Sequence, residues 1–178
     1  MNSGSNRLIF LCGMMGTGKS QVGKQLARKL NLTFTDLDSI IESETGMTIN
    51  QIFKIKGEPG FREIERDKLH QCTQQSDGVV ALGGGTLQNQ QLVDLVKNSG
   101  ILIFIDTPEE ILLKRLKRSR RRPMIHGLNH DELIQLIRKL LDERLPYYNQ
   151  ANIIIPGDAK NEENTTELII KELNQYND

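Results

Sequence analysis

Short, mostly apolar runs alternate along the chain with segments whose apolar residues recur at helical spacing. The runs, each of four to six residues, span Arg7–Cys12, Phe34–Asp38, Val79–Leu82, Ile101–Ile105 and Ala151–Ile155. This length and the absence of a helical period are typical of buried strands. After the first run, four apolar residues share one helical face: Val22, Leu26, Ala27 and Leu30. Strands separated by helical crossovers predict an α/β fold with a five-stranded parallel sheet and helices on both faces.

Two further helix starts and a basic stretch lie in the second half of the chain. Thr107-Pro-Glu-Glu110 offers an N-cap, a proline at the first helical position and two acids, and Asn129 is followed three residues later by Glu132. Between them, seven of the nine residues from Lys114 to Arg122 are basic, and Pro123–Gly127 interrupts any helix. We therefore expect an exposed, mobile loop between these two helices.

Length and composition limit the class of protein. The 178 residues fit a single domain, 1–178, because most domains have roughly 100–150 residues. The longest apolar run, Ile101–Ile105, is far below the ~20 residues that span a bilayer, which excludes a membrane protein. Cys12 and Cys72 form no disulfide framework, and the N-terminus has no positively charged region of an export signal. These features predict a cytoplasmic protein.

The charge balance argues against nucleic acid as a partner. The chain has 23 Lys and Arg residues and 23 Asp and Glu residues, so no overall basic field would hold it on a polyanion. It has no Trp, and aromatic residues make up only 4% of the chain, too few for a base-stacking surface. We therefore expect small-molecule substrates and no nucleic-acid or membrane partner.

A phosphate-binding motif follows the first predicted strand. Gly13-Met-Met-Gly-Thr-Gly-Lys19-Ser20 matches G-x-x-x-x-G-K-[ST], and a helix begins at its end. In such a loop, backbone N–H groups converge on phosphate oxygens, Lys19 reaches the β and γ phosphates, and the Ser20 hydroxyl ligates Mg²⁺. The alternative is a glycine-rich turn that only packs. The complete pattern in this context predicts a binding site for a nucleoside triphosphate.

Three other segments add candidate substrate-binding groups. Asp36 and Asp38 end the second predicted strand, where alternate residues share a face, so both carboxylates can point into one cleft. Alternatively, the pair supplies an acidic N-cap for the next helix, a role that Asp38 could have. Arg62 lies opposite an apolar face of its helix, and its planar fork suits a carboxylate, although Arg62 and Glu65 also have the spacing of an ordinary surface pair. Leu82-Gly-Gly-Gly85 lets backbone N–H groups approach a ligand, or is only a flexible turn.

In their order and spacing, five motifs resemble the shikimate kinase family, within the nucleoside monophosphate kinase fold, over nearly the whole chain. They are the P-loop, Asp36-Leu-Asp38, Gly57-Glu-Pro-Gly-Phe-Arg-Glu-Ile-Glu65, Leu82-Gly-Gly-Gly85 and Arg122-Pro123. The resemblance implies a three-layer P-loop kinase fold with a mobile lid at about 116–128 and a substrate-binding helical segment at about 38–65. It implies that ATP, with Mg²⁺, phosphorylates the 3-hydroxyl of shikimate, giving shikimate 3-phosphate and ADP in aromatic amino-acid biosynthesis.

The same resemblance implies roles for individual residues. The catalytic residues would be Lys19, Asp38, which orients the reacting hydroxyl or accepts its proton, and Arg122, the lid arginine on the phosphates. The ATP-binding residues would be Gly13, Met14, Met15, Gly16, Thr17, Gly18, Lys19, Ser20 and Gln21. Arg62 and Arg144 would bind the shikimate carboxylate, and Glu65 would orient Arg62 or hold its region in place. Arg115 and Pro156-Gly-Asp158 would lie at the adenine. Asp36 would hold a metal-bound water.

Two other functions remain as alternatives. A nucleoside or gluconate-type kinase would keep the P-loop and the lid, but it has no reason to combine Asp38 with Arg62 and Arg144. A GTPase switch would carry an Asn-Lys-x-Asp motif for guanine, and the sequence has none. The three histidines do not have metal-ligand spacing. We therefore expect a monomeric small-molecule kinase.

Overall fold

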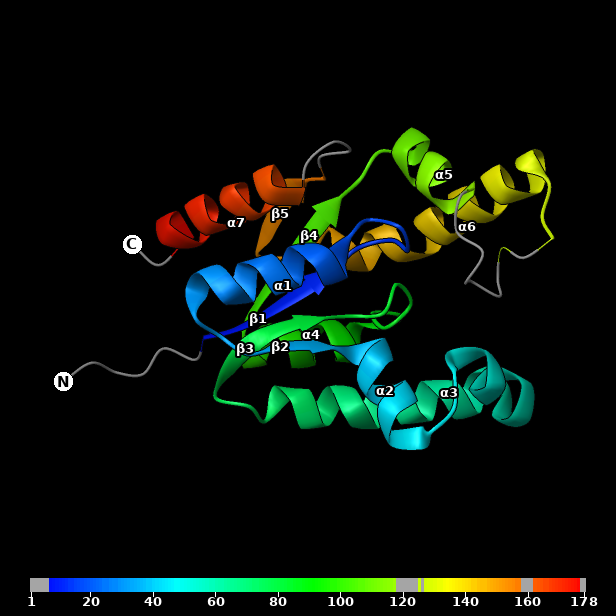
Figure 1. The fold of residues 1–178 in the computed structure, drawn as a ribbon, viewed down its shortest axis with the longest axis horizontal. Coiled ribbons are helices and arrows are strands. Elements are labelled where there is room, and N and C mark those ends of the chain that lie inside the picture. Colours follow the sequence, from blue (N-terminus) through cyan, green and yellow to red (C-terminus); the bar gives the residue numbers. More distant parts are fainter. Residues whose placement is uncertain (1–6, 118–124, 126, 158–161, 177–178) are drawn as a thin grey trace.

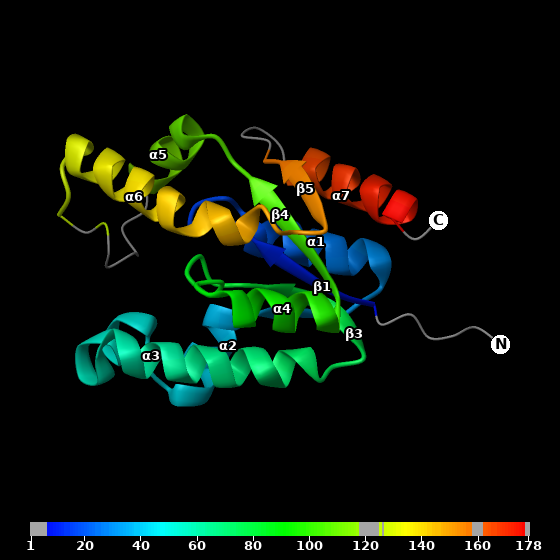
Figure 2. The same cartoon turned by 180° about the vertical axis from the view of Figure 1, so that it is seen from behind.

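Five parallel strands form one sheet in the order β2-β3-β1-β4-β5 in the computed structural model, which describes residues 7–117, 125, 127–157 and 162–176 (Figures 1 and 2). The strands are β1 Arg7–Cys12, β2 Phe34–Asp36, β3 Asp77–Ala81, β4 Ile101–Asp106 and β5 Ile153–Pro156. The central strand β1 pairs with β3, with Ile9 opposite Val79, and with β4, with Phe10 opposite Leu102. The predicted parallel five-stranded sheet is confirmed.

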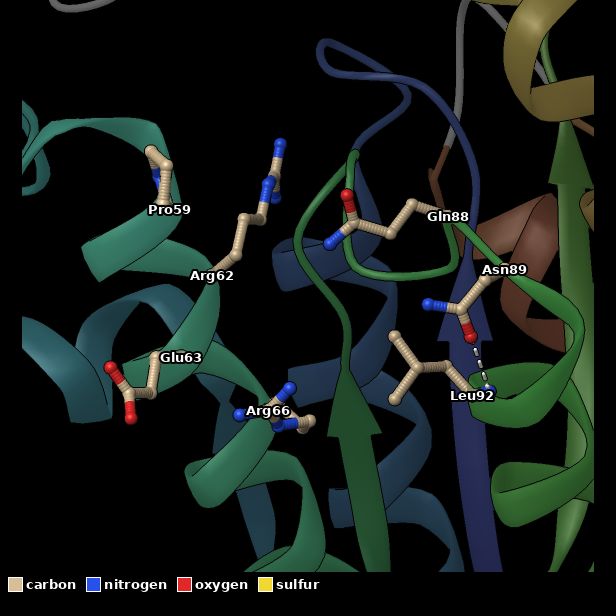
Figure 3. A pocket seen from close by; sticks show the side chains of 7 residues that line it. All are labelled: Pro59, Arg62, Glu63, Arg66, Gln88, Asn89 and Leu92. Atoms are coloured by element: carbon tan, nitrogen blue, oxygen red, sulfur yellow. Dashed lines mark hydrogen bonds between the residues drawn. The ribbon is translucent and has the colours of Figure 1, made fainter.

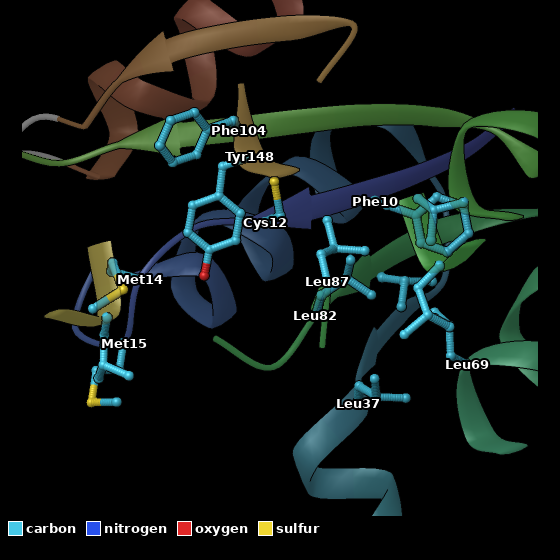
Figure 4. Close-up of a cluster of buried hydrophobic side chains, with 14 of the residues drawn as sticks. Phe10, Cys12, Met14, Met15, Leu37, Leu69, Leu82, Leu87, Phe104 and Tyr148 are labelled. Carbon is cyan, nitrogen blue, oxygen red and sulfur yellow. The ribbon is translucent and has the colours of Figure 1, made fainter. Parts of the chain in front are cut away.

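Helices cover both faces of the sheet. They are α1 Lys19–Leu30, α2 Leu37–Thr45, α3 Ile49–Thr73, α4 Gln90–Ser99, α5 Glu109–Lys117, α6 His130–Tyr148 and α7 Glu162–Tyr176. Side chains of α1 and α7 pack in one apolar cluster with the sheet, and side chains of α2 to α6 pack in a second cluster, part of which Figure 4 shows. Alternate residues of β1 serve the two clusters: Phe10 faces the second and Leu11 the first. This arrangement explains why the strands are apolar at nearly every position.

The second strand is shorter than expected, and this changes the local setting of the two aspartates. β2 ends at Asp36, and α2 begins at Leu37, because the Asp36 carboxylate accepts a hydrogen bond of 3.1 Å from the Ser39 N–H and caps the helix. The prediction that Asp36 and Asp38 share one face of a strand was therefore wrong. An acid does cap the next helix, as the alternative had it, but the cap is Asp36 and not Asp38, which lies in the first turn of α2.

The predicted loop after residue 113 also starts too early. Lys114 to Lys117 form the last turn of α5, where Leu116 is buried against Gly16 of the P-loop. Residues 118–124 and 126, which include Arg122 and most of the expected lid, lie outside the described part.

The starts of α5 and α6 lie close to the predicted positions. α5 begins at Glu109, one residue later than predicted: the Pro108 carbonyl accepts a bond from the Leu112 N–H, so Pro108 is the residue that precedes the helix. α6 follows Asn129, which forms the expected capping box with Glu132.

A break in α3 positions the segment that carries Arg62. Gly57 has φ 68° and ψ 179°, which only glycine adopts without strain, and Pro59 follows it. The chain therefore resumes a helix in a new direction just before Arg62. No helix among the described residues is both long and apolar enough to span a membrane.

Candidate active site

The loop between β1 and α1 forms a cradle with the Lys19 side chain folded over it. Gly13, Gly16 and Gly18 have φ angles of 145°, 86° and 95°, so the loop uses backbone conformations that other residues rarely adopt. The buried Lys19 ammonium donates to the carbonyls of Gly13 (2.8 Å) and Met14 (3.0 Å). The ammonium therefore lies at the loop that would surround the phosphates of a nucleotide.

A cavity of about 400 Å³ extends from this loop to α2 and to the glycine loop after β3. It is lined by Gly16, Gly18, Lys19, Ser20, Gln21, Asp36, Asp38, Leu82, Gly84, Arg115 and Glu162. β1, β2 and β3 all end at this edge of the sheet, where parallel α/β proteins bind ligands. The structure thus brings together residues of the P-loop, both aspartates, Gly84 and Arg115 around one cavity.

Oxygen donors suited to Mg²⁺ lie side by side in this cavity. The Ser20 hydroxyl donates a hydrogen bond to the Asp36 carboxylate, so the two side chains are in direct contact. Mg²⁺ in phosphoryl-transfer sites uses one or two protein oxygens together with phosphate oxygens and water. The pair therefore fits the ion, although the described part of the chain has no group of three or more His, Cys, Asp and Glu side chains that could hold a metal alone.

Two arginines approach the glycine loop closely because the loop has no side chains. A Cβ atom at Gly85 would lie 2.6 Å from Nη2 of Arg62, and a Cβ atom at Gly84 would lie 3.4 Å from Nη1 of Arg144. Arg62 comes from α3 and Arg144 from α6, so two guanidinium groups supplied by different helices lie against this loop. This pair of positive groups can hold an anionic part of a small ligand.

Arg62 is held on α3 by two glutamates. Its Nη1 donates to Glu65 at 2.7 Å, and its Nη2 donates to Glu58 at 3.2 Å. The Glu65 side chain is only 3% exposed, whereas the Glu58 side chain is 64% exposed. The buried Arg62 Nε has no hydrogen-bond partner among the described residues. The buried ion pair with Glu65 therefore fixes the position of Arg62, whereas the ion pair with Glu58 is exposed to solvent.

Arg62 also borders a smaller cavity of about 280 Å³ between α3 and the segment that leads into α4 (Figure 3). Its lining residues are Pro59, Arg62, Glu63, Arg66, Gln88, Asn89 and Leu92. Figure 3 shows the Gln88 amide across from Arg62, and the Asn89 side chain accepting a hydrogen bond from the Leu92 N–H. The segment after the glycine loop thus faces α3 directly and ends in the cap of α4.

Arg144 and Tyr148 connect α6 to the same loop. Arg144 is only 8% exposed, and its Nη1 lies 3.5 Å from the Met14 sulfur. The Tyr148 hydroxyl donates to the Gly84 carbonyl, and its ring packs on Phe104 with the centroids 5.1 Å apart (Figure 4). Burial, mainly through desolvation, raises the pKa of Tyr148 above its ordinary value, so the hydroxyl keeps its proton and stays a donor.

Arg115 lies at the far end of the cavity, toward α7. Its Nη1 donates to the carbonyls of Gly16 (3.0 Å) and Thr17 (2.8 Å). Glu162, the first residue of α7, lines the same end of the cavity. Arg122 and Asp158 lie outside the described residues, whereas Pro156 ends β5.

Two polar residues of the site had no role in the sequence interpretation. Thr86 follows the three glycines and donates from its hydroxyl to Glu65, and Tyr148 holds Gly84. Each hydrogen bond joins residues that are far apart in the sequence and belong to no shared period or motif. Only the preceding glycine run marks the neighbourhood of Thr86.

Comparisons with known proteins agree with this geometry. The sequence model of the shikimate kinase family matches residues 15–174. A shikimate kinase of Chlorobium chlorochromatii is 38% identical over 174 residues, which cover 95% of this chain and 92% of the relative. The structure of a Bacteroides thetaiotaomicron shikimate kinase has a TM-score of 0.89 and 34% identity, covering 94% of this chain and 98% of that one. A shikimate kinase from Acinetobacter baumannii in complex with shikimate has a TM-score of 0.90 and 34% identity, with coverage of 97% and 95%.

Proposed function

This chain belongs to the shikimate kinase family, and from that premise we propose that ATP and shikimate meet in the cavity between the P-loop, Asp38 and the glycine loop. The chain is an ATP-dependent kinase that phosphorylates shikimate in aromatic amino-acid biosynthesis. One observation carries the assignment of the site: the phosphate cradle and Asp38 line one cavity, and two guanidinium groups lie against its glycine loop.

ATP binds at the amino-terminal end of α1 in this proposal. The nucleotide-binding residues are Gly13, Met14, Met15, Gly16, Thr17, Gly18, Lys19, Ser20 and Gln21. Backbone N–H groups and the helix dipole favour the phosphates, and the Lys19 ammonium neutralises charge on the transferred group. Ser20 would hold Mg²⁺, and Asp36 would hold a metal-bound water. When bound, the ion neutralises negative charge on the phosphates. Arg115 would contact the adenine, and Arg122 the phosphates.

Shikimate binds between α3, the glycine loop and α6. Arg62 and Arg144 take its carboxylate, because guanidinium groups bind carboxylates through two parallel hydrogen bonds. Asp38 accepts a hydrogen bond from the 3-hydroxyl and directs the oxygen at the γ-phosphorus. In a loose transition state, proton transfer is late, so orientation of the hydroxyl is the main task of Asp38.

We also propose that residues 1–178 form one domain, which acts as a monomer in the cytoplasm. The length of the chain supports a single domain, and the buried free thiols of Cys12 and Cys72 support a reducing compartment such as the cytoplasm. Light scattering on the purified protein measures the mass directly. A mass near 20.2 kDa is the expected result.

A substrate panel tests the proposed function. ADP formation is measured with ATP and, in turn, shikimate, quinate, gluconate and AMP. Turnover is expected with shikimate, with far smaller rates for the other acceptors, because only shikimate offers both the carboxylate and the correctly placed hydroxyl. Turnover with gluconate or AMP and none with shikimate would instead support another small-metabolite kinase on this fold.

A further inference from the structure

Thr86 connects two walls of the proposed shikimate site through one buried hydrogen bond. Its hydroxyl donates to Oε1 of Glu65 at 2.6 Å, although the two residues are 21 positions apart in the sequence. Thr86 is only 1% exposed, so this contact is closed to water. It joins the loop after β3 to α3, the helix that carries Arg62.

On the loop side, Thr86 closes the turn that holds the glycines. Its backbone N–H donates to the Gly83 carbonyl at 3.2 Å, which fixes the position of Gly84 and Gly85 between the two residues. A Cβ atom at Gly83 would lie 2.9 Å from each of Asp38 Oδ1, Glu65 Oε1 and Thr86 Oγ1. The turn is therefore packed directly against the carboxylates of Asp38 and Glu65.

On the helix side, Glu65 passes this restraint to Arg62. One carboxylate oxygen accepts from Thr86, and the other accepts from Arg62 Nη1 at 2.7 Å. A buried carboxylate must find protein hydrogen-bond donors because water cannot replace them. With both oxygens bonded, the carboxylate has a fixed rotation, and so has the guanidinium group that it supports.

We propose that Thr86 is a positioning residue for the carboxylate end of the substrate: its hydroxyl fixes Glu65, and Glu65 fixes Arg62. The inference rests on the proposed function, since it assumes that Arg62 binds the shikimate carboxylate. In this proposal, Thr86 acts through Glu65 and Arg62 and does not itself bind ATP or the reacting hydroxyl. Its loss is therefore expected to affect shikimate binding and not the chemical step.

The test compares Thr86→Val and Thr86→Ser with the wild type by steady-state kinetics for both substrates. Valine keeps the shape but removes the donor, so the KM for shikimate is expected to rise about five- to tenfold, in the range of one typical lost hydrogen bond. The kcat and the KM for ATP are expected to stay within about twofold. Serine restores the hydroxyl and is expected to restore the KM for shikimate.

A matched control separates positioning from simple loss of packing. Thr73 is the last residue of α3, the helix that carries Arg62 and Glu65. It is also buried, and its hydroxyl donates to the His70 carbonyl at 2.7 Å. Thr73→Val is expected to lower the melting temperature without changing the KM for shikimate. In a Glu65→Gln background, Thr86→Val is expected to add little, because the two residues act through one contact. Thr86→Ala removes the hydroxyl without adding a methyl group beside Glu65, and gives the same comparison if valine impairs folding.

The outcomes distinguish this inference from the proposed function. A wild-type KM for shikimate in both Thr86→Val and Thr86→Ala, or equal impairment of Thr86→Ser and Thr86→Val, would overturn the positioning role while shikimate turnover by the wild type persists. An absence of shikimate turnover in the wild type would overturn the proposed function, and the role of Thr86 with it. A selective rise in the KM for shikimate that serine reverses supports both.

Discussion

At the scale of single residues, the proposed site depends on how many donors Arg62 offers in one plane. Its guanidinium group bonds to Glu65 and still has further N–H donors for a ligand. Lysine carries one ammonium and cannot hold Glu65 and a carboxylate in the same planar arrangement. Arg62→Lys is therefore expected to raise the KM for shikimate by about tenfold or more, as measured by steady-state kinetics, with little change in the KM for ATP.

Arg66 provides the matched control for this substitution. It lies one helical turn further along α3, is exposed, and lines the smaller cavity between α3 and the segment that leads into α4 (Figure 3). Arg66→Lys is expected to leave both KM values near those of the wild type. A rise in the KM for ATP alone in Arg62→Lys would contradict the proposed role of Arg62.

The proposed roles of Ser20 and Asp36 in binding Mg²⁺ can be tested by measuring how activity depends on the Mg²⁺ concentration. Ser20→Ala removes a proposed ligand, and Asp36→Asn removes a charge while retaining a side chain that can cap α2. Each substitution is expected to raise the Mg²⁺ concentration for half-maximal activity by about tenfold, in the range found when ligand or supporting groups of metal sites are removed. An unchanged Mg²⁺ titration in both variants would refute this metal assignment.

At the scale of elements, local sequence patterns predicted which segments form strands and helices, and side-chain capping and packing decided boundaries that the sequence analysis missed. The apolar runs and the capping box at Asn129 are local patterns, so they were visible in the sequence. The end of β2 was not, because Asp36 is compatible with both a strand end and a helix cap, and only its bond to Ser39 distinguishes them. The basic stretch after Lys114 continues α5 because Leu116 is buried against the P-loop.

The break in α3 gives a prediction about an element and the residue that it positions. Gly57→Ala places a side chain at φ 68° and ψ 179°, a region that costs of order 1–3 kcal/mol for other residues. The free energy of unfolding, measured by denaturant titration, is expected to fall by roughly that amount. Because Arg62 follows the break by little more than one turn, the KM for shikimate is expected to rise as well.

Gly46, at the end of α2, is the control for Gly57. It also has a left-handed conformation, with φ 66°, and no atom lies within 4 Å of a Cβ atom added there. Gly46→Ala is expected to lose about 1 kcal/mol of stability and to leave the KM for shikimate unchanged. If Gly57→Ala lost stability with a wild-type KM, the break would serve folding alone.

At the scale of the whole molecule, the sequence predicted which segments meet but not the buried hydrogen bonds that join them. The P-loop, Asp38 and the glycine run reach one cavity because parallel strands end at the same edge of the sheet. The hydrogen bonds of Thr86 with Glu65 and of Tyr148 with Gly84 were not predicted. They depend on the packing of α3 and α6 against the loop, which has no periodic signature.

The packed interior also protects the thiols of Cys12 in β1 and Cys72 in α3. Burial, mainly through desolvation, raises the pKa of Cys12 from 9.0 to about 12, and also raises the pKa of Cys72. Both thiols are expected to react slowly with a thiol-specific reagent at pH 8, and rapidly once the protein is unfolded in guanidinium chloride. For Cys12, the neutral thiol stabilises the folded state fully below pH 9, and this contribution is lost as the pH rises from 9 to about 12. Rapid reaction of both thiols in the folded protein would contradict the described packing.

The most direct test of the proposed active site is the kcat of Asp38→Asn at saturating ATP and shikimate, with the affinity for a fluorescent ATP analogue measured in parallel. Asparagine keeps the shape of Asp38 but removes the charge that orients the shikimate hydroxyl. The kcat is expected to fall by about a hundredfold or more, while the Kd of the analogue stays within about twofold of the wild-type value, because the P-loop is unchanged. A wild-type kcat in Asp38→Asn would contradict the assignment of this cavity as the place where the phosphoryl group is transferred.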